Sequence, residues 1–486
     1  MNNIELITNG SIKEIREAVI NRKLYTTELV NFFIQRIKNN KINSFISLYE
    51  DDALKRAEEL DKKLKNCEKP GKLFGIPYAV KDNIAVKGYE VTCASKMLKN
   101  YKATYNATVI NKLNDEDAIF LGKTNLDEFA MGSSTETSYF GTTLNPWDNN
   151  RVPGGSSGGS AAAIASRESV FALGSDTGGS IRQPAAFCGV TGLKATYGFV
   201  SRFGLVAFAS SLDQVGPIGR SAEDLELIFS IISGFDEKDT TTKKIENYKV
   251  SEPTKRKFNI AYTNDIFGEE ISPDIKNNIL SILNLLKKEG HSISEVAFNF
   301  SKHSVPVYQI LSCSEASSNL ARYDGIRYGY QTKSYKSLLD LYNRSRGEGF
   351  GEEVKRRILF GTYILMAKNN ALYTSSFKVS RLIRKNLENI FTEYDVFITP
   401  TTFSPPFKIG EIIDDPIKMH HSDAFTSICN LSGNPGISIP LGLTDNNLPI
   451  GMQIIAKRFD ENNLFQFAKY IQSITDYHKC LPEGVK

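Results

Sequence analysis

The sequence predicts a large α/β protein built on a mainly parallel β-sheet. Short apolar runs that resemble strands alternate with helix-like segments along most of the 486 residues, and this alternation is typical of parallel sheets covered by helices. Hydrophobic residues make up 41% and charged residues 23% of the chain, which is ordinary for a globular protein and argues against disorder. The length allows two or three domains or one large layered unit.

The first 70 residues are predicted to form a helical segment. In residues 11–40, apolar side chains recur at four-residue spacing after Thr26 and Thr27, and either threonine can cap a helix. A second helical pattern covers residues 51–65. Packing against a core is sufficient to explain both patterns.

Residues 71–234 are predicted to form the central αβ unit. The apolar side chains of its first strand lie on one face, so alternation places Ala79 and Lys81 on the other face. The polar residues 133–146 form a loop that is long enough to line a pocket. Strands are expected at 76–80, 118–122, 170–173 and 190–193, and helices at 125–131, 161–166 and 221–233.

Residues 235–257 are polar, charged and nearly free of large apolar side chains, which predicts a surface connection. The alternation of strands and helices then resumes in residues 258–486. Strands are expected at 258–262, 293–298, 395–399, 436–439 and 451–455, and helices at 273–288, 352–391 and 461–474.

Composition narrows the classes of function. Lys and Arg outnumber Asp and Glu by 59 to 55, without the basic arm of an autonomous nucleic-acid-binding protein. The six cysteines form no CxxC motif and no metal-site spacing with histidine, and this usage suits the reducing cytoplasm. Because we find neither a signal-peptide pattern nor a run of about 18 apolar residues, we expect a cytoplasmic protein that does not span a membrane.

Two glycine-serine clusters stand close together, at residues 154–160 and 177–180. Backbone amides without obstructing side chains can bind phosphate, but a P-loop requires GxxxxGK followed by Ser or Thr, and a dinucleotide site requires GxGxxG after a strand. Neither cluster has either pattern, so phosphate binding is disfavoured. Acyl transfer by a serine nucleophile is the alternative interpretation.

The base that would activate such a serine is either a histidine or a lysine. All five histidines lie downstream of the clusters, none in a suggestive motif, and the clusters contain no GxSxG elbow; a histidine triad assembled by the fold remains open. A lysine can act as base if burial lowers its pKa of ~10.4 by up to ~3 to 5 units. Lys81 is the candidate, although a surface lysine at a strand end would fit the same position.

Three segments together resemble the amidase signature family: PYAVKDN at 77–83, GGSSGGS at 154–160 and GSDTGGSIRQPA at 174–185. Four others are similar to the glutaminase subunits of tRNA-dependent amidotransferases, a branch of that family: residues 127–141, 145–163, 196–217 and 314–330. The resemblance implies an α/β amidase signature fold with α/β/α layers around a large mixed sheet. Residues 71–234 would then be the core with the catalytic relay, and residues 258–486 would complete the fold and the substrate pocket.

The resemblance also implies a catalytic set. Ser180 would be the nucleophile, Ser156 the bridging serine, often preceded by a cis peptide bond, and Lys81 the base. The oxyanion hole would consist of the backbone amides of Thr177, Gly178, Gly179 and Ser180. Adjacent glycines suit this role because they let backbone donors approach a substrate oxygen without obstruction.

The substrate implied by the resemblance is glutamine, which carries an α-carboxylate and an α-ammonium group. Arg357 would bind the carboxylate, with the register between Arg356 and Arg357 left open, and an arginine suits this role by its bidentate geometry. Asp423 would bind the ammonium group and Tyr308 would line the site.

The resemblance further implies a heterotrimer with B and C subunits. This chain would hydrolyse glutamine to glutamate and ammonia without a metal or cofactor of its own. The B subunit would use ATP and Mg to convert Glu-tRNA(Gln) to Gln-tRNA(Gln) and would make most of the contacts with tRNA. The alternatives are a stand-alone amidase that acts on another amide and a non-catalytic assembly subunit.

The chain departs from the family pattern at two positions. It has Ala195 where the family has proline and Phe199 where the family has arginine. An exchange of arginine for phenylalanine is expected to alter a surface contact with tRNA or a partner.

Overall fold

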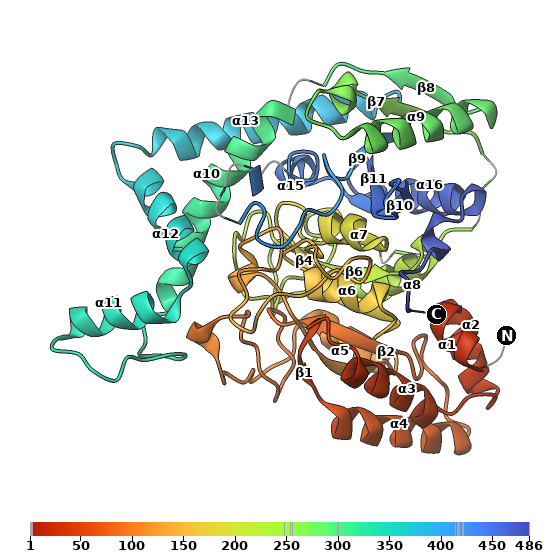
Figure 1. Cartoon of the computed structure of the whole chain (residues 1–486), viewed down its shortest axis with the longest axis horizontal. Helices are drawn as coiled ribbons and strands as arrows, with labels where there is room; N and C mark the ends of the chain where they lie inside the picture. The colour runs from red at the N-terminus through yellow and green to blue at the C-terminus, as the bar shows by residue number, and fades with distance from the viewer. Residues whose placement is uncertain are drawn as a thin grey trace.

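The computed structural model describes residues 3–246, 248–252, 254, 256–298, 301–413, 415, 418–419 and 422–485. Within them, 11 strands form one sheet in the order β1-β3-β2-β4-β6-β5-β10-β11-β9-β7-β8 (Figure 1). The strands are β1 (Phe45–Leu48), β2 (Pro77–Lys81), β3 (Ile119–Thr124), β4 (Phe171–Asp176), β5 (Thr191–Lys194), β6 (Gln214–Gly219), β7 (Asn259–Tyr262), β8 (Ser292–Glu295), β9 (Val396–Pro400), β10 (Gly436–Leu443) and β11 (Pro449–Ala456). The α-helices are α1 (Asn3–Asn9), α2 (Ile12–Ile20), α3 (Thr26–Asn39), α4 (Glu50–Lys65), α5 (Thr108–Asp115), α6 (Gly158–Ala165), α7 (Arg182–Cys188), α8 (Ala222–Ile232), α9 (Pro273–Lys288), α10 (Ser301–Asn319), α11 (Leu338–Gly349), α12 (Glu352–Leu365), α13 (Ala371–Ile390), α15 (Ser427–Ser432) and α16 (Glu461–Ile474).

Helices cover both faces of this sheet. On one face, Ala79 and Ala172 pack in one apolar cluster with residues of α6 and α7. On the other face, Tyr78 and Phe171 stack at 5.2 Å between ring centroids and belong to the larger core that includes α3, α4, α8 and α16. The α/β/α layers and the large mixed sheet implied by the resemblance are therefore confirmed.

The expectation of a mainly parallel sheet is wrong. Among the described strands, β2 runs parallel to β3 and β4, and β7 runs parallel to β8 and β9, whereas the other neighbouring strands pair antiparallel. No α-helix separates β5 from β6 or β10 from β11, and strands joined without a crossover helix can pair antiparallel. The alternation of apolar and helix-like segments in the sequence does not indicate which strands are joined without a helix.

The predicted N-terminal helices are confirmed, but the predicted threonine cap of α3 is wrong. The helix begins at Thr26, and the N-cap position is Tyr25. The carboxylate of Asp61 in α4 accepts the amides of Thr26 at 3.0 Å and Thr27 at 3.2 Å. A side chain distant in the sequence thus satisfies amides that a local cap would otherwise bind.

The helix predicted at 125–131 is also wrong. Only a 3₁₀ turn at Glu128–Ala130 forms there, because Phe129 and Ala130 adopt φ angles of 50° and 61° that an α-helix does not accept. The sequence pattern also missed β1, β6, α1, α5, α7, α10 and α11. Several of these elements are short, so they contain too few residues for a periodic pattern to be recognised.

The predicted connection at 235–257 contains no helix or strand among its described residues, and Asn247, Pro253 and Lys255 lie outside the described residues. The ring of Tyr248 packs on Phe229 at 4.9 Å between centroids, and its hydroxyl donates to Glu226 at 2.5 Å. The connection is therefore fastened to α8. No helix in the described part of the chain is long and apolar enough to cross a membrane.

Candidate active site

Lys81 ends strand β2 on the sheet face covered by α6 and α7, and its side chain is fully buried. Its Nζ lies 2.7 Å from Ser156 Oγ and 2.9 Å from the Oγ atoms of Ser157 and Ser175. Ser156 and Ser157 precede α6, and Ser175 belongs to β4, which lies beside β2. The sheet thus places one amine among three hydroxyl groups.

Burial lowers the pKa of Lys81 to about 7, and the attraction of the Asp127, Asp176 and Asp213 carboxylates only partly opposes this shift. Lys81 forms no ion pair within the described part of the chain. A large fraction of the amine is therefore neutral near pH 7, and a neutral amine beside a hydroxyl can accept its proton.

Ser156 lies shortly before α6, in the segment that follows β3, and the Gly155–Ser156 peptide bond is cis. The Gly155 amide donates to Gln183 Oε1 at 2.9 Å. The Ser157 amide donates to the carbonyl of Ser180 at 3.0 Å, which joins the two glycine-serine clusters directly. The two clusters are thus in direct contact beside Lys81.

Ser180 follows Gly179 and precedes α7, and it retains 6% exposure. Gly179 has a φ of 143°, and a Cβ there would lie 2.1 Å from Thr426 Oγ1, so only glycine fits. The amides of Gly178, Gly179 and Ser180 donate no hydrogen bond to any described residue. These amides can therefore receive a substrate oxygen.

Lys81 and Ser156 are in hydrogen-bond contact in the structure. The next contact of the predicted relay, between Ser156 and Ser180, is not formed. The Ser180 hydroxyl makes no hydrogen bond to Ser156 or to another described residue. Catalytic hydrogen bonds often tighten only when substrate is bound. The relay from Ser156 to Ser180 thus remains a prediction.

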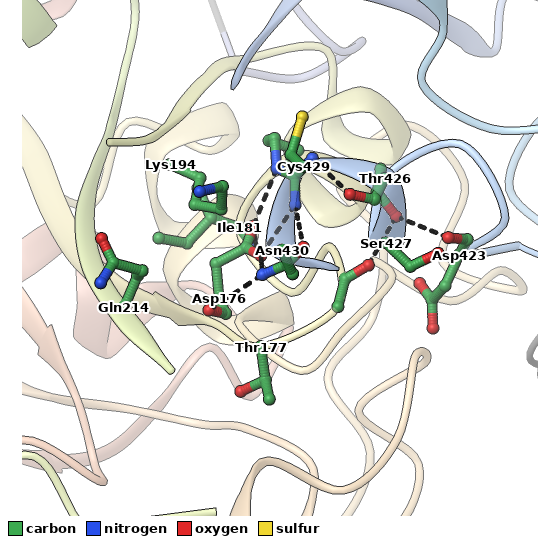
Figure 2. A network of polar contacts seen from close by, with 12 residues as sticks. Asp176, Thr177, Ile181, Lys194, Gln214, Asp423, Thr426, Ser427, Cys429 and Asn430 are labelled. Carbon is green, nitrogen blue, oxygen red and sulfur yellow. Dashed lines mark hydrogen bonds and ion pairs between the residues drawn. The ribbon is translucent and has the colours of Figure 1, made fainter. Parts of the chain in front are cut away.

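A buried ion pair between Arg182 and Asp176 anchors the loop that carries Ser180, and Figure 2 labels Asp176 together with its neighbour Asn430. Arg182 donates from Nε and Nη2 to the Asp176 carboxylate at 3.1 and 2.9 Å. Asn430 of α15 donates to Asp176 Oδ1 at 2.9 Å, and the Ile181 amide donates to Asp176 Oδ2 at 3.1 Å. The Asp176 carboxylate thus accepts hydrogen bonds from several donors, and a buried carboxylate requires such donors to compensate for the loss of water.

Tyr308 of α10 lies directly on the Ser180 loop. A Cβ at Gly178 would meet the Tyr308 ring at 2.5 Å, so the glycine permits this approach. Tyr308 is buried, and burial raises the pKa of its phenol above the usual range while the charge of Arg357 opposes this shift. Tyr308 thus links the loop to the neighbouring helix α12.

Arg357 of α12 is buried at 2% exposure, whereas the side chain of Arg356 is 39% exposed. The Arg357 guanidinium lies over the Phe208 ring at 5.5 Å from its centroid, and its Nε donates to Glu353 at 2.7 Å. Among the described residues, no carboxylate accepts a hydrogen bond from its two terminal nitrogens. Of the two neighbouring arginines, Arg357 is therefore the one that faces the interior.

Asp423 precedes α15 and is buried, with one carboxylate oxygen accepting from Ser133 Oγ at 2.8 Å. Burial raises the pKa of Asp423 to about 7, although the Ser133 hydrogen bond and the charge of Arg357 lower it. A cation bound beside this carboxylate would favour its ionised form.

Sequence reasoning did not assign roles to several residues that shape the site. Ser157 and Ser175 lie within or beside the quoted motifs, so their proximity to Ser156 and Ser180 was a usable signal. Asp213 accepts from Thr177 Oγ1 at 2.7 Å, and Thr426 Oγ1 donates to the Gly178 carbonyl at 2.7 Å. Nothing in the local sequence around these last two contacts indicates that they form.

The expected surface role of Phe199 is wrong. Its ring is buried and packs edge-to-face on Phe229 at 5.1 Å, with Phe459 at 5.7 Å. Ala195 is also buried, and its carbonyl accepts from Lys194 Nζ at 2.8 Å. Both residues therefore lie in the interior of this chain.

The alternative of a histidine base has no support in the described residues. His291 accepts the Phe258 amide at 3.0 Å, and no described histidine has a hydrogen bond to Ser156 or Ser180. His420 and His421 lie outside the described residues. In the same part of the chain, no group of three His, Cys, Asp or Glu side chains could hold a metal ion.

Comparisons with known proteins agree with this geometry. The model of the Amidase family matches residues 28–465. The A subunit of the glutamyl-tRNA(Gln) amidotransferase of Sulfurihydrogenibium sp. (strain YO3AOP1) is 50% identical over 480 residues, which cover 97% of this chain and 99% of that protein. The protein of the same name in Geobacillus thermodenitrificans (strain NG80-2) is 49% identical over 478 residues, covering 97% and 98% of the two chains.

Solved structures show the same likeness. The crystal structure of the A subunit of glutamyl-tRNA(Gln) amidotransferase from Thermotoga maritima superposes with a TM-score of 0.78 at 40% identity, covering 94% of each chain. A bacterial aryl acylamidase of the amidase signature family shares the fold with a TM-score of 0.84 at 23% identity, covering 98% of each chain. The family match and the near-complete coverage of these relatives show that the chain belongs to the amidase family, the amidase signature enzymes.

Proposed function

We propose that this chain is the glutamine-hydrolysing subunit of a Glu-tRNA(Gln) amidotransferase. The observation that carries the proposal is the Lys81 amine, buried without a counter-ion among the described residues and 2.7 Å from Ser156 Oγ, beside the loop that carries Ser180. The names of the relatives, which are 50% and 49% identical to this chain, support the glutamine and tRNA context.

In the proposed reaction, neutral Lys81 accepts a proton from Ser156 while Ser156 accepts the proton of Ser180. Ser180 Oγ attacks the carbonyl carbon of the glutamine side-chain amide. The resulting oxyanion receives hydrogen bonds from the amides of residues 177–180, where donors are pre-positioned for developing charge. The C–N bond then breaks, the relay returns the proton to the leaving ammonia, and water hydrolyses the glutamyl ester on Ser180.

Two buried side chains of opposite charge support glutamine as the substrate. The terminal nitrogens of Arg357 donate to no carboxylate of a described residue and suit the carboxylate of a substrate. Asp423 suits an ammonium group, and Tyr308 lies between Arg357 and the Ser180 loop. An aryl or fatty amide would supply neither charge, so this pocket argues against the stand-alone amidase alternative.

The proposal includes B and C subunits as partners in a cytoplasmic heterotrimer. The B subunit would use ATP and Mg to activate the glutamate on tRNA(Gln) and would make most of the tRNA contacts. In the proposed complex, the present chain requires no cofactor, and its role is to supply ammonia to the B subunit.

The Ser180→Ala variant tests the proposal in the purified complex. Loss of a serine nucleophile that acts in a relay is expected to reduce glutamine hydrolysis by up to ~10⁶-fold. Lys81→Arg retains the charge but has no neutral amine, so it should be nearly as inactive. Both variants should still form Gln-tRNA(Gln) when ammonia is supplied.

Two results would contradict the proposal. Glutamine-dependent activity unchanged in Ser180→Ala would favour a non-catalytic assembly subunit. Rapid hydrolysis of aryl or fatty amides without glutamine turnover would favour a stand-alone amidase. The ammonia-dependent reaction serves as the control that each complex is assembled and binds tRNA.

A further inference from the structure

The loop at residues 177–180 is joined to the proposed ammonium-binding residue by one hydroxyl group. Thr426 Oγ1 lies 2.7 Å from the Gly178 carbonyl and 3.1 Å from the Asp423 carbonyl, and its single hydrogen is shared between them. Figure 2 shows Thr426 with its contact toward Asp423. Thr426 is fully buried, and its own carbonyl accepts from Arg182 Nη1 at 2.8 Å.

A second chain of contacts joins the same loop to Arg357. Thr177 Oγ1 donates to Asp213 at 2.7 Å, and the Asp213 carboxylate also accepts the amides of Phe208 and Ala209 at 2.9 and 3.0 Å. The Phe208 ring lies under the Arg357 guanidinium, at 5.5 Å from its centroid. Asp213 is buried, so these hydrogen bonds are shielded from water.

Each charged residue proposed for the glutamine α-carbon is therefore fixed to the oxyanion loop through one side chain. The backbone of Asp423 is connected to the loop through the Thr426 hydroxyl, and the backbone of Phe208, whose ring lies against Arg357, is connected to it through the Asp213 carboxylate. The loop holds the reacting amide, whereas the charged residues hold the other end of the substrate. The two bridges thus connect the loop to the backbone segments that carry Asp423 and support Arg357.

We propose that Thr426 and Thr177, through these two bridges, select glutamine over asparagine by its length. The inference rests on the proposed function and deepens it. Asparagine is shorter by one methylene, a carbon-carbon bond of about 1.5 Å, so with its α-substituents bound its amide would not reach the oxyanion loop. One methylene is typically worth about 10- to 200-fold in discrimination. Thr426 and Thr177 act through their neighbours and are positioning residues in this role.

The test compares kcat/KM for glutamine with kcat/KM for asparagine in the assembled complex. Thr426→Val has nearly the same shape but no hydroxyl, so the glutamine preference should fall by about 10-fold or more. Thr426→Ser retains the hydroxyl and should keep the preference within about 3-fold of the wild type. An unchanged preference in Thr426→Val, or an equal fall in Thr426→Ser, would overturn the role of this bridge.

Thr177→Val and Thr177→Ser repeat the comparison at the second bridge and keep the inference testable if Thr426→Val does not fold. The Thr177 valine variant should lose preference and the serine variant should retain it. A wild-type complex that does not hydrolyse glutamine would reject the proposed function. Glutamine hydrolysis by the wild type with an unchanged preference in both valine variants would reject the length selection alone.

Discussion

Lys81 and Asp423 are two buried ionisable residues of the candidate site, and both have a pKa of about 7. Burial disfavours charge, so it lowers the pKa of the amine and raises that of the carboxyl group. The two residues have different requirements. Lys81 must be neutral to act as a base, whereas Asp423 must be ionised to attract an ammonium group.

These two pKa values predict how glutamine hydrolysis depends on pH. Above about pH 7 Lys81 is neutral, so kcat should rise with pH through that region and then level off. Asp423 is ionised in the same range, so KM for glutamine should fall as pH rises, with bound ammonium moving the transition to lower pH. Initial rates measured from about pH 5.5 to 9, a range that spans the pKa of about 7 of both residues, would separate the two profiles.

Asp423→Asn provides the matched comparison. The variant should raise KM at high pH by about 10- to 100-fold, the typical effect of losing a hydrogen bond to a charged group. It should also flatten the pH dependence of KM and leave that of kcat intact. Asp445→Asn, in the exposed turn between β10 and β11, is a control that should change neither profile. A kcat that is independent of pH would exclude Lys81 as the base.

At the level of secondary-structure elements, helix α12 is held in place by a carboxylate from the turn after β3. Gly351 is the N-cap of α12, and its amide donates to Glu128 Oε2 at 2.9 Å. The other oxygen of Glu128 accepts from Ser95 Oγ. A carboxylate at a helix N-terminus is favourable, and in this case the helix carries Arg357.

Replacement of Glu128 should therefore affect stability and substrate binding together. Glu128→Ala leaves the Gly351 amide and the buried Ser95 hydroxyl without their acceptor, and an unsatisfied buried donor such as Ser95 costs about 1 to 3 kcal/mol of unfolding free energy. The start of α12 should shift, and KM for glutamine should rise because Arg357 moves with the helix. Urea unfolding and glutaminase kinetics on the same samples would measure both effects.

Glu128→Gln is the matched control, since its amide oxygen can still accept from Gly351. This variant should keep KM close to the wild-type value. If Glu128→Ala lost stability with no change in KM, the carboxylate would support the fold without positioning Arg357.

At the level of the whole molecule, one sheet contains strands from the N-terminal segment, from residues 71–234 and from residues 258–486. Strand β1 of the N-terminal segment pairs with β3, and β5 pairs with β10 across the connection, with Lys194 opposite Gly436. Lys81, Ser156 and Ser180 lie before the connection, whereas the proposed pocket residues lie after it. We propose that residues 71–234 and 258–486 are functional regions of one folding unit.

This proposal predicts that residues 71–234 do not fold alone. The fragment would leave β5 without its β10 neighbour and would expose the side of α7 that packs on β10 and β11. It should unfold without a cooperative transition in urea, followed by circular dichroism, whereas the full chain should unfold cooperatively. A sharp transition of the isolated fragment would instead show an independent domain.

The sequence by itself was sufficient for the α/β class and for helices such as α9 and α16, and the resemblance of three segments to the amidase signature family led to Lys81, Ser156 and Ser180 as a candidate set. Short motifs and local periodicity carry this information, because each depends on residues close in the chain. Only the tertiary structure decided strand directions, the burial of Arg357 and not Arg356, and the interior position of Phe199. It also placed Asp213 and Thr426 against the Ser180 loop, contacts that span 36 and 248 residues of sequence. Such contacts depend on how distant elements pack, and no local pattern records them.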